Sequence, residues 1–180
     1  MHVFGYRDLG DEKAFWDKFP KLEERAILMD RPNKLKFKKL LQIYTFFSGR
    51  SFHHVLGYSR EMQEKIDQIL EKESFDIIQT EFPSMSFFNF RSDALKVLDA
   101  HNIEYDNFLR MSKINGDPVR RIFYKREYNV LKREEIDIWN SRDAIFATSK
   151  RDESIMNKAA PGVPTYVIPN GVDTEFFYPM

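Results

Sequence analysis

One stretch, residues 143–173, constrains the fold more than any other, because it has the pattern of a strand, a helix and a second strand in turn. The apolar runs 144–147 and 166–168 lack polar alternation, which is typical of strands buried on both faces. Between them, residues 151–160 carry apolar side chains on one helical stripe and stop at a proline–glycine pair. A unit of this kind joins parallel strands, so the sequence predicts an α/β fold.

Length and composition narrow the class of protein. A chain of 180 residues has the length of one domain and can remove roughly 70% of its unfolded surface from water. Its 28 basic residues balance 28 acidic ones, so no overall field attracts nucleic acid. Cysteine is absent, which excludes disulfides and thiolate chemistry and fits a reducing cytoplasm. No apolar run approaches about 20 residues and no signal-peptide pattern is present, so we expect a cytoplasmic protein.

The rest of the chain alternates between the same two kinds of segment. Strand patterns occupy residues 2–6, 26–29, 75–81 and 96–100, and helix patterns occupy residues 12–25, 34–47, 59–72, 107–114 and 118–140. Ser59 and Asp117 are suited to begin two of these helices. The segment 81–88 is expected to be a loop. The sequence therefore predicts one domain over residues 1–180, a Rossmann-like parallel sheet with helices on both faces.

Polar residues follow several of the predicted strands. In open parallel sheets, ligands bind beyond the carboxyl ends of the strands. The candidates at these ends are Glu81, His101, Asn102, Glu104, Ser149 and Asn170. A neutral imidazole can donate or accept a hydrogen bond, which suits a hydroxyl partner, although a single histidine after a strand is often a loop residue. His53 and His54 are adjacent and cannot chelate together on a helix, so we expect surface or packing roles for them, and no metal site or cofactor.

Two motifs near the carboxyl end resemble a known family. The runs Asp143-Ala-Ile-Phe-Ala-Thr-Ser149 and Val167-Ile-Pro-Asn-Gly-Val-Asp-Thr-Glu-Phe-Phe-Tyr-Pro179 are similar to the end of the N-terminal, acceptor-side domain of glycosyltransferases with the two-domain GT-B fold. The likeness is closest to the large retaining family that includes sucrose synthases and mannosyltransferases. Residues 99–104, Asp-Ala-His-Asn-Ile-Glu, match a pattern at the end of that family's fifth strand. The resemblance covers nearly all of the chain.

The resemblance implies a function and residue roles. The parent enzyme would transfer a sugar from a nucleotide-diphosphate sugar to a lipid, polysaccharide or small acceptor, with retention of configuration and no protein nucleophile. His101 would be the catalytic contact to the donor sugar or diphosphate. Glu81, Asn102, Glu104, Ser149 and Asn170 would bind substrate, and Gly171 would serve as a hinge. Glu135 corresponds to a helix-anchoring residue rather than a catalyst.

The chain also departs from the family. Neither the first strand with its glycine-rich loop nor the nucleotide-sugar domain has a counterpart, so the resemblance implies a domain truncated at both ends and inactive alone. The missing strand would lie between 2–6 and 75–81, and its loss leaves about ten hydrogen bonds unmade at roughly 1 kcal/mol each, comparable to a domain's whole stability. We therefore expect these two strands to pair directly, or a second chain to supply a strand in a strand-exchanged homodimer.

A non-catalytic interaction or membrane-surface module is the alternative function. Residues 34–47 combine four lysines with aromatic and aliphatic residues, which suits a helix lying on the anionic inner face of a membrane. Lysines that simply face water are the competing interpretation. The basic residues of 118–140 leave the same two possibilities open: a solvated helix face, or contact with an acidic acceptor or a phospholipid head group. A flavodoxin-like or dinucleotide-binding protein is disfavoured, because no glycine-rich strand-to-helix turn exists.

Overall fold

A computed structural model describes residues 2–7, 16–17, 20–23, 26–30 and 38–171. The chain divides into two compact units, Met1–Lys38 and Lys39–Met180, within the single domain predicted over residues 1–180.

The first unit contains a pair of parallel strands. β1 (Val3–Arg7) pairs with β2 (Ala26–Asp30), with Gly5 opposite Leu28, which confirms both predicted strands. The short helix α2 (Pro20–Glu23) begins at a proline, a residue whose fixed φ and missing N–H suit a first helical position. Most of the predicted helix 12–25 lies outside the described residues.

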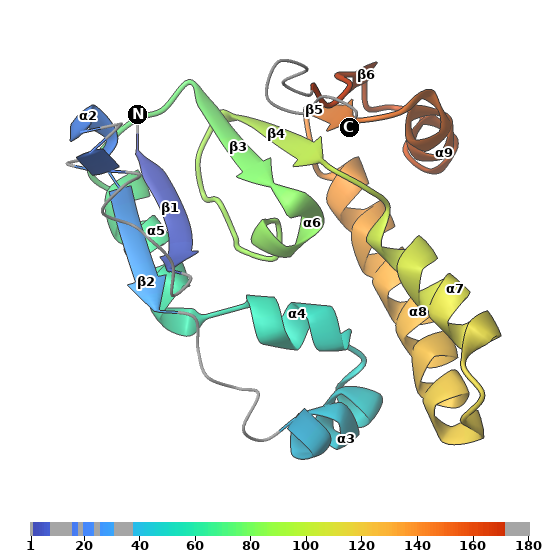
Figure 1. Cartoon of the computed structure of the whole chain (residues 1–180). Helices are drawn as coiled ribbons and strands as arrows, with labels where there is room; N and C mark the ends of the chain where they lie inside the picture. The colour runs from blue at the N-terminus through green and yellow to red at the C-terminus, as the bar shows by residue number, and fades with distance from the viewer. Residues whose placement is uncertain (1, 8–15, 18–19, 24–25, 31–37, 172–180) are drawn as a thin grey trace, which may run out of the picture. The chain divides into compact units, whose positions relative to one another are not determined.

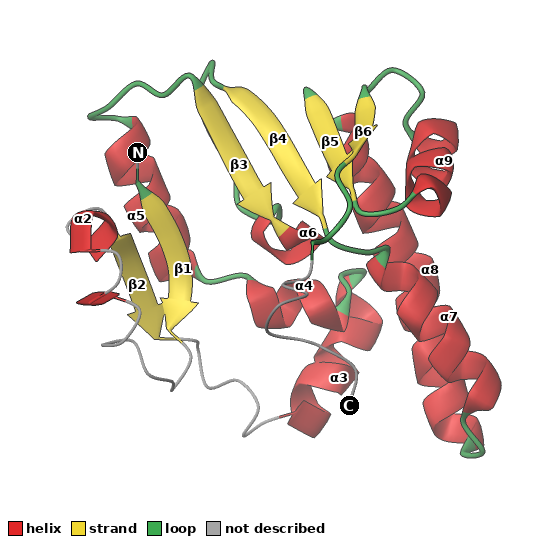
Figure 2. Cartoon of the chain, turned by 45° about the horizontal axis from the view of Figure 1, so that its top comes forward, coloured by secondary structure: helices red, strands yellow, loops and turns green. Residues whose placement is uncertain are grey.

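The second unit is built on a four-stranded parallel sheet (Figures 1 and 2). Its strands are β3 (Ile77–Glu81), β4 (Leu95–Ala100), β5 (Ala144–Ala147) and β6 (Thr165–Val167), paired in that order. The helix α9 (Lys150–Ala159) connects β5 to β6, and α7 (Glu104–Ile114) with α8 (Pro118–Asn140) connects β4 to β5. The predicted α/β fold and the β-α-β unit near the carboxyl end are therefore confirmed.

Four further helices precede or interrupt these strands. They are α3 (Lys38–Ser48), α4 (Phe52–Gly57), α5 (Arg60–Leu70) and α6 (Phe82–Met85). Ser59 caps α5 by accepting a hydrogen bond from the Met62 amide, and Asp117 caps α8 by accepting from the Val119 and Arg120 amides, as predicted. The segment expected to be a loop after β3 instead forms α6, with Pro83 in its first turn.

The core lies on one face of the sheet. Leu98 and Ile145 are fully buried there against Leu131, Trp139 and Met156 of the helices. Alternate strand residues point to the opposite face, where Ile77, Leu95 and Tyr166 remain more than half exposed. Within the second unit, the strands are therefore buried on one face rather than on both as predicted, and α8 and α9 both pack on that face.

Strand pairing is described within each unit. β1 and β2 form a two-stranded sheet of their own, and β3 is hydrogen-bonded to β4 alone among the described strands. Direct pairing of residues 2–6 with 75–81, and a strand supplied by a second chain, both stay predictions, and the outer edge of β3 is the place where such a strand would pair.

Buried glutamates of α8 hold the beginnings of two other helices. Glu127 accepts a hydrogen bond from the Phe52 amide at 2.7 Å and Glu134 accepts one from the Ser51 amide at 3.2 Å, both at the start of α4. Glu135 accepts from the Glu104 and Tyr105 amides, each at 3.0 Å, at the start of α7. Each carboxylate thus satisfies amides that have no partner within their own helix. The helix-anchoring role expected for Glu135 is confirmed.

Arginines of α8 hold the end of α3 in the same way. Arg126 donates to the carbonyls of Thr45 and Arg50, and Arg133 donates to the carbonyl of Gly49. Cationic donors suit the last carbonyls of a helix, which carry partial negative charge. The solvated interpretation is therefore wrong for Arg126, whose side chain is largely buried, whereas Arg133 remains exposed. No helix in the described ranges is long and apolar enough to cross a membrane.

Candidate functional site

The carboxyl ends of β3, β4 and β5 meet at one edge of the second unit's sheet, because neighbouring strands run parallel (Figure 1). The Thr148 hydroxyl, just after β5, donates a hydrogen bond to the carbonyl oxygen of His101, just after β4, at 3.0 Å. The predicted convergence of polar strand ends on one edge is thus present.

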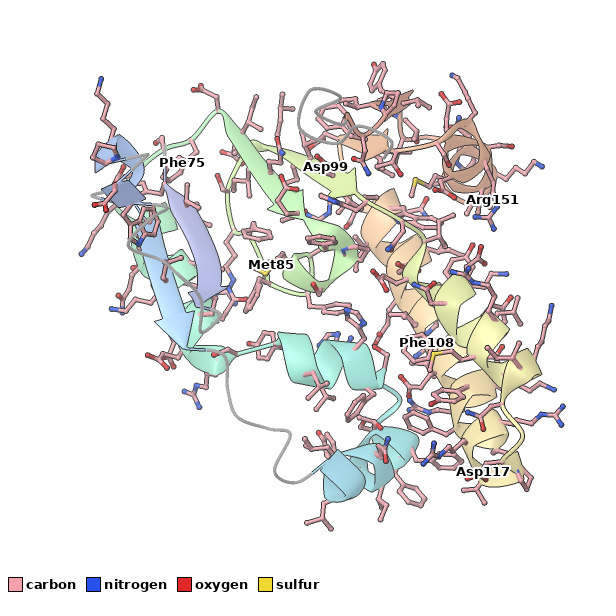
Figure 3. All side chains as sticks on the ribbon, in the orientation of Figure 1. Phe75, Met85, Asp99, Phe108, Asp117 and Arg151 are labelled. Atoms are coloured by element: carbon pink, nitrogen blue, oxygen red, sulfur yellow. The ribbon has the colours of Figure 1, made fainter. Side chains whose placement is uncertain are left out.

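Three ionisable side chains gather at this edge. Glu81 lies opposite Asp99 in the β3–β4 register, so both point to the same face of the sheet, and His101 follows two residues after Asp99. His101 Nε2 lies 2.9 Å from Glu81 Oε2. One ligand atom from each of Glu81, Asp99 and His101 lies within 4.8 Å of the other two. We call these three residues the rim cluster; Figure 3 marks Asp99 within it.

Charge in the rim cluster is not balanced by basic side chains of the described chain. Gln79 donates to Glu81 Oε1 at 2.7 Å, whereas no described residue donates a hydrogen bond to the Asp99 carboxylate. Partial burial, and then the negative charge of Glu81, raise the pKa of Asp99, while His101 opposes the rise. Two neighbouring carboxylates and one imidazole therefore form a site that favours a bound proton or cation.

Phe82 orients the imidazole of this cluster. Its ring stacks on His101 with centroids 4.1 Å apart and planes inclined by 25°. Phe82 has φ of 64°, the left-handed region that costs a non-glycine residue about 1–2 kcal/mol. Sequence reasoning missed Phe82, for which the sequence carries no signal. It also missed Asp99, although the spacing of Asp99 and His101 in an extended strand places both on one face.

A separate groove of about 320 Å³ runs along α7 and reaches the first turn of α9. Its polar lining comes from both helices and includes Asn102, Asp106, Asn107, Arg110, Lys113 and Arg151. Arg151, marked in Figure 3, is paired with Asp106 and Asp152. Arg110 and Lys113 are therefore the cations on this lining without a carboxylate ion pair among the described residues. Asn102 contributes to this groove, whereas His101 does not line it.

The remaining predicted site residues have other local surroundings. Ser149 caps α9 by accepting from the Asp152 amide at 3.2 Å, which is a structural role. Glu104 begins α7, with its carboxylate 3.5 Å from Asn107 Nδ2. Asn170 is exposed beyond β6. A Cβ at Gly171 would meet no described atom within 4 Å, and its φ is outside the left-handed region, so the fold itself does not require glycine there.

The two adjacent histidines of α4 contribute to packing. The His53 and His54 rings lie 6.4 Å and 4.2 Å from the Phe87 ring, measured between centroids, and burial lowers the pKa of His53. These contacts agree with the packing roles predicted for them.

Neither a protein-family model nor a curated protein sequence matches this chain. Functional assignment of the site therefore depends on its own residues and their arrangement.

Proposed function

We propose that this chain is the acceptor-side domain of a retaining GT-B glycosyltransferase, whose parent enzyme transfers a sugar from a nucleotide-diphosphate sugar to a lipid, polysaccharide or small acceptor. The observation that supports the proposal most is the pair of His101 and Glu81, 2.9 Å apart at the carboxyl edge of a parallel sheet. The motifs around Ser149 and Asn170, which resemble that family, add to it.

The pair gives His101 a defined chemical role. An ionised carboxylate only accepts hydrogen bonds, so the contact with Glu81 places the imidazole proton on Nε2. Nδ1 is then free to accept a hydrogen bond from a hydroxyl of the donor sugar. The stacked Phe82 ring holds the imidazole in this orientation. Asn102, in the neighbouring groove, offers an amide to the diphosphate or to an acceptor hydroxyl.

Sugar transfer then proceeds without a protein nucleophile. The bond from the anomeric carbon to the diphosphate oxygen breaks as the bond to the acceptor oxygen forms on the same face. The acceptor proton leaves with the departing diphosphate, whose charge the enzyme must stabilise. In this assignment Glu104, Ser149 and Asn170 border the substrate and Gly171 permits domain closure. The enzyme works in the cytoplasm, with its acceptor at the inner face of the membrane when that acceptor is a lipid.

Heteronuclear NMR of the isotope-labelled chain tests this proposal. UDP-glucose and GDP-mannose, titrated to about 5 mM because a half-site binds weakly, should shift the amide signals of His101 and Asn102. His101→Ala should remove the response, whereas His53→Ala, which changes the same residue type on α4, should retain it. Shifts confined to residues away from the carboxyl edge would contradict the proposal. The isolated chain should release no nucleoside diphosphate in a coupled assay.

The strand-exchanged homodimer is proposed for the same chain. The edge of β3 leaves its outward backbone groups without a strand partner among the described residues. A second chain that pairs there would double the mass measured by sedimentation equilibrium. Replacing Gln79, in the middle of β3, by proline removes a ladder donor and should return the chain to a monomer. A monomeric wild-type chain at high concentration would rule out the exchange.

A second candidate function, docking on an anionic membrane surface, is favoured by α3. Five large apolar residues of this helix are at least half exposed, and Phe47 is 82% exposed: Leu40, Ile43, Tyr44, Phe46 and Phe47. The lysines at positions 34, 36, 38 and 39 precede or begin the same helix, although their side chains lie outside the described residues. An apolar helix surface beside basic residues is typical of interfacial helices.

Flotation with vesicles separates this function from sugar transfer. The chain should float with phosphatidylserine vesicles and not with phosphatidylcholine vesicles, since each lysine near the surface contributes about 1 kcal/mol. Changing the four lysines to glutamate, or Phe47→Ser, should release it. Equal binding to both vesicles would exclude an electrostatic membrane contact.

A further inference from the structure

The rim cluster has the donor set of a transition-metal site. We propose that Glu81, Asp99 and His101 bind a divalent cation, with Zn²⁺ preferred over Mg²⁺ and Ca²⁺. This inference does not require sugar transfer, and it gives His101 a different role: an ion bound at Nε2 takes the place of the proton that the sugar-transfer assignment puts on that nitrogen.

The distances in the cluster are close to what a metal ion needs. Bonds from Zn²⁺ to imidazole nitrogen or carboxylate oxygen are about 2.0–2.2 Å, so two ligand atoms of one ion lie about 3–3.5 Å apart. His101 Nε2 and Glu81 Oε2 are 2.9 Å apart, and the widest separation among the three ligand atoms is within 4.8 Å. Side-chain rotation closes this difference, because Glu81 and His101 are 50% and 37% exposed and free of tight packing on the solvent side.

Strand pairing positions two of the three ligands. Glu81 and Asp99 face each other in register on neighbouring strands, and His101 is the first residue after β4. The Phe82 ring holds the imidazole plane from one side, at 4.1 Å between centroids. Two ligands on paired strands and a third directly after one of them need little ordering when an ion binds, which reduces the cost of binding.

The charges in the cluster favour a cation over a simple ion pair. Glu81 and His101 form one pair, which leaves the second carboxylate, Asp99, without a hydrogen-bond donor among the described residues. A surface ion pair would need only Glu81 and His101, and would contribute little. A cation at the centre neutralises both carboxylates and uses the imidazole nitrogen as a ligand in place of its proton.

The ligand types decide which cation is preferred. Imidazole suits Zn²⁺ and other late first-row ions, whereas Mg²⁺ and Ca²⁺ prefer oxygen alone. Three protein ligands leave one position of a tetrahedral ion open, and the exposure of the cluster places that position toward solvent. An ion bound here is therefore able to accept an oxygen of water or of a ligand.

Calorimetric titration of the full chain with Zn²⁺ tests the site, and Co²⁺ provides a visible absorption band that reports the number of ligands. Wild type should bind one Zn²⁺ at least about 100-fold more tightly than Mg²⁺. His101→Ala and Asp99→Asn should each weaken Zn²⁺ binding about 10–100-fold, the range known for changes near metal ligands. The imidazole nitrogen signals of His101 should shift on addition of Zn²⁺.

Matched variants distinguish a true site from general binding. Asp93→Asn removes an exposed carboxylate just before β4 and should leave Zn²⁺ affinity unchanged. If Asp99→Asn binds Zn²⁺ as tightly as wild type, the cluster is only a histidine–glutamate ion pair and the proposal fails. It also fails if His101→Ala retains the wild-type affinity, because binding then occurs elsewhere. Circular dichroism of each variant confirms that the fold is intact.

Discussion

Two groups of acidic residues in the second unit differ in burial and in what their carboxylates contact. The carboxylates of Glu127, Glu134 and Glu135 on α8 are buried and accept hydrogen bonds from backbone amides. Glu81 and Asp99 of the rim cluster are partly exposed, and neither accepts a backbone amide among the described residues. The first group holds helices together, whereas the second leaves its oxygens available to a proton, cation or ligand.

The difference teaches where function is to be sought in this fold. A buried carboxylate that accepts hydrogen bonds from backbone amides stabilises structure, and removing it leaves those amides unsatisfied. A half-exposed carboxylate beside another carboxylate destabilises the ligand-free protein by charge repulsion. Such repulsion is common at sites that bind ligands. The comparison predicts that removing a glutamate of α8 causes a large loss of stability. Removing a charge of the rim cluster should instead cause a small gain.

Glu135→Ala should have the largest effect. The change orphans the Glu104 and Tyr105 amides at the buried start of α7, each costing about 1–3 kcal/mol, so about 4 kcal/mol should be lost at pH 6. Urea denaturation followed by circular dichroism measures it. The matched change Glu64→Ala removes an exposed i,i+4 ion pair and should cost at most about 0.5 kcal/mol. Equal losses in the two variants would contradict the helix-anchoring role.

The pH dependence of stability comes next in size. Burial, and then the charges of Glu104 and Asp106, raise the pKa of Glu135 to about 8, although the two amide hydrogen bonds oppose the rise. A carboxyl whose pKa is raised on folding stabilises the protein below its unfolded pKa of about 4.5 and loses that contribution as pH rises through about 8.

The free energy of unfolding should therefore fall by up to about 1.4 kcal/mol per pH unit between about pH 5 and pH 8. Burial also raises the pKa of Glu127, which adds to the same slope. Glu135→Gln, which cannot titrate, should flatten the profile measured by urea denaturation at successive pH values. An unchanged slope in that variant would assign the pH dependence to other groups.

Much of this arrangement was predictable from sequence, for identifiable reasons. Strands and helix starts were predictable because their signals are local. A strand is recognised from an apolar run such as 144–147, and a helix start from a capping residue such as Ser59 or Asp117 with the few residues that follow it. The convergence of Glu81 and His101 followed from the rule that parallel strands end at one edge.

Long-range contacts were beyond that reasoning. Glu127 meets Phe52 across 75 positions, and Arg126 meets Thr45 across 81, with no periodicity that marks either pair. The exposed second face of the sheet also went unpredicted, because runs such as 144–147 are apolar whether one face or both is covered. Asp99 was missed as a site residue because it lies inside the strand rather than after it.

Glu127→Ala should have an intermediate effect. It orphans the Phe52 amide at the start of α4 and removes the partner of Arg126, for a loss of about 2 kcal/mol. Because α4 contains only six residues, the loss should appear locally as faster hydrogen exchange of the amides of residues 52–57. Exchange that accelerates equally in α9 would point to general unfolding rather than loss of an anchor.

Asp99→Asn should have the smallest effect and the opposite sign. Its pKa is raised by partial burial and by Glu81, so the negative charge is less favourable in the folded protein than in the unfolded chain. Removing the charge should stabilise the metal-free protein, by at most about 0.5 kcal/mol because solvent screens a partly exposed pair. Differential scanning calorimetry with a chelator present should show a midpoint raised by no more than about 2 °C. A clear destabilisation would mean that Asp99 anchors structure as the α8 glutamates do, and the contrast between the two groups would be lost.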